Sequence, residues 1–276
     1  MAVVTRTGRD RSRRDLTAPW RHLDPILITC TLVLSALGVL MVFSATRGPT
    51  EPARTDYLVR QGSFTVVGLA VMAVVTTIDY RRIRDWAWVL YGGVAVLLIG
   101  VLSPLGSQSK GAQAWFAFGP FQFQPAEFAK LALIVVLASL IALWRGDIDL
   151  RRLVVLLVVA GAPMALILLQ PDLGTALVLV AITVGVLAIG GLKGRYLLAL
   201  VLIGLIGAVG ALNSGVLKQY QKDRFTAFLD PGADKQGVTY NVNQSQLAIS
   251  NGGLTGEGLF EGRQTQLEFV PEQQTD

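Results

Sequence analysis

An acidic and a basic residue lie three positions apart at the start of an apolar segment of this 276-residue chain. On a helix, Glu127 and Lys130 would share one face and could form an ion pair. Charged side chains at the edge of a membrane are costly and usually face a protein-lined or wet cavity, which favours a binding site. A purely structural interpretation fits equally: the helix dipole favours Glu127, and Lys130 reaches to the membrane surface.

Further ionisable groups stand in the other polar parts of the chain. Asp172 follows Pro171, a position well suited to capping the helix that comes next. Lys222 and Arg224 lie close together in the polar segment behind the last apolar stretch, where they would either bind a pyrophosphate or remain solvated. Asp276 ends the chain. Taken in isolation, Asp276 indicates no particular chemistry.

Motifs for cofactor or metal chemistry are missing from the sequence. It has no glycine-rich phosphate loop with a following lysine, no GxSxG elbow, no HExxH pair and no calcium loop. His22 is the only histidine and Cys30 the only cysteine, which argues against a zinc site of the usual kind and excludes an intrachain disulfide.

The composition predicts an all-α polytopic membrane protein. Hydrophobic residues make up 52% of the chain and charged residues only 16%, which is too apolar for a soluble domain of this length. The net charge of +5 comes mostly from arginines ahead of the first apolar stretch. A basic flank of this kind orients a helix in the membrane, and it lacks the aromatic residues that would suggest nucleic-acid binding.

Seven segments are close to the roughly 20 apolar residues that a helix needs to cross a bilayer. They are Ile26–Ser44, Leu58–Ile78, Trp86–Leu102, Pro125–Leu143, Leu153–Leu169, Leu173–Leu192 and Tyr196–Leu212. The first is longer than a signal-peptide core, so we expect it to be uncleaved. The chain therefore divides into a basic tail (1–25), a transmembrane body (26–212) and a polar loop (213–276).

The helix starts and the loop charges complete this topology. Asp24 before Pro25, and Gln124 before Pro125, are expected to cap helices that begin with proline. Lys and Arg in the short loops favour a cytoplasmic N-terminus. This places 45–57, 104–124, the Gln170–Asp172 corner and 213–276 outside the cytoplasm, where we expect the function to lie.

Four blocks of sequence, in the same order, resemble the SEDS family of RodA, FtsW and SpoVE. They are the blocks WFAFGPFQFQPAEFAK (115–130), QPDLGT (170–175), YQKDRFTAFLDP (220–231) and FVPEQQTD (269–276). The block GRQTQLEFVP (262–271) is more similar to RodA, the elongation member, than to FtsW, the division member.

The resemblance implies a peptidoglycan glycosyltransferase of the bacterial cytoplasmic membrane that polymerises lipid II on the outer face. Its partner would be a class B penicillin-binding protein. The family has ten transmembrane helices with a large extracytoplasmic loop after the seventh. Within that pattern Asp276 corresponds to the catalytic acid, and Glu127 and Lys130 correspond to the paired residues of the fourth helix.

This chemistry needs one carboxylate base and several cations. Asp276 would take the proton from the acceptor's 4-hydroxyl. The departing undecaprenyl pyrophosphate would be stabilised by Lys130 and Arg224 and by Lys222 or Lys110, with or without a divalent cation. Glu127 would hold Lys130 in place, and Asp172 belongs to the same substrate-binding set.

Departures from the family pattern concern single residues and the end of the chain. Ala114 and Glu257 stand where the family often has cations, which puts the pyrophosphate contacts in question. The family continues after Asp276 into three more helices, so we expect a C-terminally truncated member in which Asp276 lacks its supporting helices. Two other functions stay open: a lipid II flippase, and a non-catalytic scaffold for a penicillin-binding protein.

Overall fold

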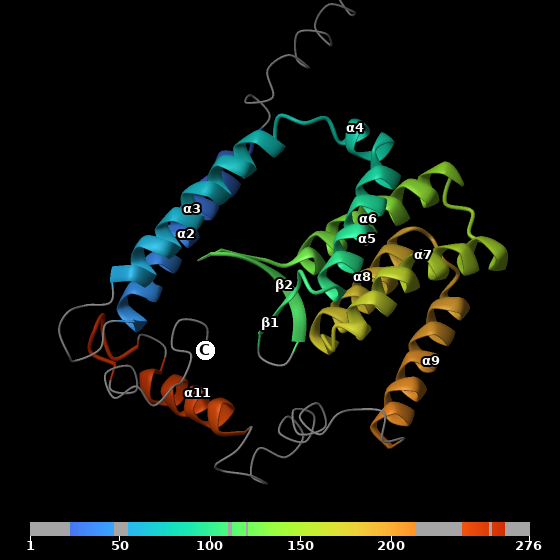
Figure 1. The fold of residues 1–276 in the computed structure, drawn as a ribbon. Helices are drawn as coiled ribbons and strands as arrows, with labels where there is room; N and C mark the ends of the chain where they lie inside the picture. The colour runs from blue at the N-terminus through green and yellow to red at the C-terminus, as the bar shows by residue number, and fades with distance from the viewer. Residues whose placement is uncertain are drawn as a thin grey trace, which may run out of the picture. The chain divides into compact units, whose positions relative to one another are not determined.

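The computed structural model describes residues 23–46, 55–109, 112–119, 121–213, 239–253 and 256–262. The chain divides into two compact units, one made of residues 1–78 with 222–276 and the other of residues 79–221. The described part of each unit is mainly helical (Figure 1).

In the first unit, α2 (Pro25–Ala45) packs along α3 (Thr55–Val75). The predicted cap of α2 is confirmed: the Asp24 carboxylate accepts hydrogen bonds from the backbone N–H groups of Ile26 and Leu27. The helix α3 ends three residues before the predicted end at Ile78. The hydroxyls of Thr76 and Thr77 donate to backbone carbonyls three residues back, where the helix tightens and stops.

The polar C-terminal segment contributes two described pieces to this unit. One is the helix α11 (Thr239–Gly252), and Gly253 after it has a φ of 55°. Further on, the Phe260 N–H donates to Ser44 Oγ at 3.0 Å, and the Phe260 ring lies 5.5 Å from that of Phe43. The segment 256–262 is thereby joined to the C-terminal end of α2.

The second unit is a helical bundle with a small antiparallel sheet, and its strand order is β1-β2-β3. Its elements are α4 (Tyr80–Asp85), α5 (Ala87–Leu102), β1 (Ser107–Ser109), β2 (Ala112–Phe118), β3 (Phe121–Phe123), α6 (Pro125–Leu143), α7 (Leu150–Leu169), α8 (Leu173–Ile189) and α9 (Gly194–Asn213).

The core of this unit lies around α6, which packs against α5, α7 and α8. Its buried side chains recur every three or four residues, the spacing of one helix face. They are Pro125, Ala126, Ala129, Ala132, Leu133, Val136, Leu137, Leu140 and Ile141. The opposing face of α8 repeats this spacing with Ala176, Leu179, Thr183 and Leu187. Small residues near the start of α6 let its neighbours approach closely.

Two turns of this unit meet through their backbones. Gly146 after α6 has a φ of 76° and Gly191 after α8 has a φ of 90°, conformations that favour glycine. A Cβ on Gly191 would lie 3.5 Å from the carbonyl oxygen of Gly146, and one on Gly146 would lie 3.6 Å from that of Gly190. The two turns are therefore in direct contact.

Each of the seven predicted segments coincides with a helix. By length and composition, α2, α3, α6 and α7 are long and apolar enough to cross a membrane, while α5, α8 and the part of α9 from Gly194 to Gly210 are shorter apolar stretches. The sheet was not anticipated. The alternation in Phe121-Gln122-Phe123-Gln124 has the period of two that indicates a strand, so a signal was present for β3.

Candidate functional site

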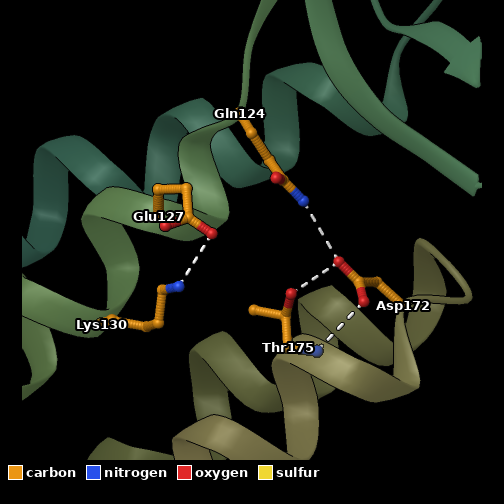
Figure 2. A network of polar contacts seen from close by, with 5 residues as sticks. All are labelled: Gln124, Glu127, Lys130, Asp172 and Thr175. Atoms are coloured by element: carbon orange, nitrogen blue, oxygen red, sulfur yellow. Dashed lines mark hydrogen bonds and ion pairs between the residues drawn. The ribbon is translucent and has the colours of Figure 1, made fainter. Parts of the chain in front are cut away.

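The predicted pairing of Glu127 with Lys130 is confirmed at the start of α6. Lys130 Nζ donates to Glu127 Oε1 at 2.8 Å, and the side chains are 25% (Lys130) and 55% (Glu127) exposed (Figure 2). Proline at the first helical position fixes the backbone there without the loss of a hydrogen bond. Both charged groups are thus carried by a well-defined first turn.

This pair faces an open cavity of about 380 Å³. It is a shallow depression on the surface of α6, lined within the described residues by two charged side chains, Glu127 and Lys130, and two apolar ones, Phe128 and Leu131. Of the three N–H donors of the Lys130 ammonium, Glu127 takes one within the described residues. The other two donors are available to anionic oxygens of a ligand that has an apolar part.

Asp172 caps α8, as the sequence predicted. Its Oδ1 accepts from the Thr175 backbone N–H at 3.1 Å, and its Oδ2 accepts from the Thr175 hydroxyl at 2.7 Å. The Gln124 side-chain Nε2 also donates to Oδ2, at 3.2 Å. Asp172 is therefore held by three hydrogen bonds, one of which comes from the start of another helix.

The prediction for Gln124 was right about its position and wrong about its hydrogen bond. Gln124 is the N-cap residue of α6, but its side chain makes no capping bond. Glutamine is not among the preferred N-cap residues, which have shorter polar side chains. Its amide reaches Asp172 instead and joins the starts of α6 and α8.

The two polar networks consequently lie at the facing N-terminal ends of α6 and α8 (Figure 2). Gln124 belongs to one network and Glu127, three residues further on, to the other. The structure thus brings Glu127, Lys130 and Asp172 to one end of the bundle. The positive ends of both helix dipoles point to the same region, which favours negative charge there.

Gln170, at the corner between α7 and α8, helps to hold the start of α8 in place. It was not singled out by the sequence analysis. It is completely buried, and its Nε2 donates to the Leu98 carbonyl of α5 at 3.2 Å. Its Oε1 has no hydrogen-bond partner among the described residues. A buried amide two residues before Asp172 anchors the α7–α8 corner to α5, although its free oxygen carries a desolvation cost.

The remaining predicted site residues, Lys110, Lys222, Arg224 and Asp276, lie outside the described residues. Within the described residues, no three His, Cys, Asp or Glu side chains gather as metal ligands.

In comparison with known proteins, residues 24–276 match the family of FtsW, RodA and SpoVE, which is described as "Cell cycle protein". The chain is 34% identical over 261 residues to a probable peptidoglycan glycosyltransferase FtsW of Geobacter sp. (strain M18), covering 92% of this chain and 70% of that relative. It is also 34% identical over 255 residues to the peptidoglycan glycosyltransferase MrdB of Escherichia coli (strain K12), covering 92% of this chain and 67% of that relative.

A solved structure gives the same picture of the fold. The structure described as "Structural coordination of polymerization and crosslinking by a peptidoglycan synthase complex" matches with a TM-score of 0.68 and 34% identity, covering 84% of this chain and 67% of the other. The similarity therefore extends through both the sequence and the arrangement of helices.

Proposed function

The chain belongs to the family of FtsW, RodA and SpoVE, which makes it a peptidoglycan glycosyltransferase of the membrane, and we propose that it polymerises lipid II at the outer membrane surface. Lipid II joins a disaccharide peptide to an undecaprenyl pyrophosphate, so its site must hold an anion and an apolar tail together. The cavity beside Glu127 and Lys130 offers both kinds of surface, and this observation carries the proposal.

Each proposed residue has one chemical task. Asp276 is the general base that removes the proton from the acceptor's 4-hydroxyl while the anomeric carbon of the donor is attacked. Lys130, Arg224, Lys222 and Lys110 are the cations that stabilise the departing pyrophosphate. Glu127 orients Lys130 through their 2.8 Å ion pair. Asp172 is already held by Gln124 and Thr175, so its main task is to position the helix starts.

The proposed topology places the N-terminus in the cytoplasm and residues 213–276 on the outer side. The contact of Phe260 with Ser44 supports it, because Ser44 lies at the end of α2 that this topology puts outside. The start of α6 falls on the same side when the chain is followed from helix to helix. The partner we propose is a cross-linking penicillin-binding protein, because the solved relative belongs to a synthase complex that both polymerises and cross-links.

The test is glycan synthesis from purified lipid II by the full-length protein in liposomes. We expect Asp276→Asn to lower polymerisation by about 10²- to 10⁴-fold, the usual contribution of a general base. Lys130→Met should also lower it, whereas Lys193→Met, which removes an equal charge from the opposite side of the proposed topology, should not.

Undiminished polymer from the Asp276→Asn protein would refute the assignment of the base. Translocation of labelled lipid II without polymer in the unmodified protein would instead identify a flippase. Retained assembly with the penicillin-binding protein and normal growth of a strain that carries only Asp276→Asn would identify a scaffold.

A further inference from the structure

Four phenylalanines occupy one face of the β2–β3 hairpin. In the antiparallel register, Phe116 stands opposite Phe123 and Phe118 stands opposite Phe121. Opposed residues of such a pair point to the same side, and residues two apart on a strand also share a side. Ala117 and Gln122, the intervening pair, therefore point to the other face.

This phenylalanine face is packed at its base and exposed toward its tip. At the base, a Cβ on Gly100 of α5 would lie 3.4 Å from Phe116 Cζ, and the Phe123 ring lies 5.0 Å from that of Phe128 on α6. Toward the tip, Phe118 is 64% exposed and Phe121 is 58% exposed. A continuous row of rings thus leads from the helices into the surroundings.

The connection to α6 fixes the level of this face relative to a bilayer. β3 ends at Phe123 and α6 begins at Pro125, so one extended residue, spanning about 3.3 Å, separates them. Because α6 is long and apolar enough to cross a membrane, Phe123 must lie close to the boundary between lipid and water. Phe128 and Leu131, which are 47% and 62% exposed, continue the apolar surface along α6.

We propose that the β2–β3 hairpin is a membrane-interface element whose phenylalanine face lies in the lipid boundary next to the start of α6, with Ala117 and Gln122 turned to water. Aromatic side chains concentrate at this level of a bilayer. The hairpin would fix the depth of the first turn of α6, which carries Glu127 and Lys130. Although the proposal assumes a membrane protein, it does not depend on the glycosyltransferase reaction.

Spin labels on the two faces test it directly. Single cysteines replace Phe118, Phe121, Ala117 or Gln122 in a Cys30→Ser background, because Cys30 is exposed. The labelled proteins are reconstituted into phosphatidylethanolamine–phosphatidylglycerol vesicles. Collision with oxygen, which concentrates in lipid, is then compared with collision with a water-soluble nickel chelate. A label at Val158, which is 66% exposed near the middle of α7 and away from the cavity beside Lys130, gives the reference value for lipid.

We expect a severalfold higher ratio of oxygen to nickel accessibility at 118 and 121 than at 117 and 122. Equal ratios on the two faces would overturn the proposal. Protection of 118 and 121 from both reagents would overturn it in favour of a protein partner on this face. Because all four positions are surface positions, circular dichroism should show unchanged helix content, and the readout needs no lipid II.

Discussion

The helices α2 and α3 pack together without burying a residue of either helix, whereas α6 alone buries nine residues and α7 five. Yet α2 has the highest mean hydropathy of the four long apolar helices. Hydropathy therefore selects helices that can cross a membrane, but it does not say which of them form a core. In α6 the regular spacing of small and branched side chains makes that difference.

Among the described residues, the two units also differ in how their capping aspartates are hydrogen-bonded. Asp24 and Asp172 are both N-caps, but Asp24 bonds only to its own helix, while Asp172 also receives the Gln124 amide from a neighbouring helix. The candidate site lies where helix starts are fixed against one another. Such fixed starts can hold charged groups in a set geometry, which a loosely packed pair of helices cannot do.

The largest expected effect tests the difference in packing between α6 and α2, by removing a side chain from each. Leu133→Ala should destabilise the protein by about 2–5 kcal/mol, because Leu133 is completely buried in α6 and its removal leaves a cavity. Leu34→Ala, at a 68% exposed position of α2, should stay within about 0.5 kcal/mol. Thermal unfolding in detergent measures both. Similar losses at the two positions would show that α2 is also packed.

The two capping aspartates provide the next comparison. Asp172→Ala removes the cap and leaves Gln124 and the Thr175 hydroxyl without their acceptor, so we expect a loss of about 2 kcal/mol. Asp24→Ala removes a local cap alone and should cost about 1 kcal/mol. Asp172→Asn keeps the acceptor oxygen and should recover part of the loss. Equal costs for Asp24→Ala and Asp172→Ala would mean that the link to Gln124 contributes nothing.

A smaller effect is expected from the hydroxyl that joins α5 to α7. The Tyr91 hydroxyl donates to the Val159 carbonyl at 2.7 Å in a partly buried position. Tyr91→Phe should therefore cost about 1 kcal/mol. Tyr196→Phe serves as the control, since the Tyr196 hydroxyl accepts from the adjacent, exposed Arg195. A smaller loss for Tyr91→Phe than for the control would contradict a role in holding the bundle together.

The smallest change in stability should come from the charged pair itself. Glu127→Gln should alter the free energy of unfolding by less than about 0.5 kcal/mol, because a partly exposed pair three residues apart contributes little. If Glu127 orients Lys130 for lipid II, the same variant should nevertheless lose glycan synthesis. Unchanged activity would show that the Glu127–Lys130 pair is only a contact within the helix and has no role in glycan synthesis.

Local features of this fold could be predicted from the sequence because their physics is local. An apolar stretch in a bilayer must satisfy its backbone as a helix, which is why all seven segments coincide with helices. The spacing of three between Glu127 and Lys130, and the Pro-Asp pair before α8, act within one helical turn.

The features that could not be predicted join distant parts of the chain. Gln124 meets Asp172 across 48 positions, and Gln170 meets Leu98 across 72. Nothing in the sequence around either glutamine indicates its partner, because the partner is determined by how the helices pack. Sequence reasoning therefore identified the charged members of the site and missed the amides that hold them in place.

The contact between the turns at Gly146 and Gly191 also sets where this protein can be altered for experiments. Each turn needs glycine for its backbone conformation, and a Cβ at either position would already be in van der Waals contact with the other turn. An epitope tag or fluorescent protein spliced into either turn would separate the ends of α6 and α8. Topology reporters should therefore be inserted elsewhere. Substituting alanine for Gly146 or Gly191 would show whether a change at these turns alters the site at the opposite end of the bundle.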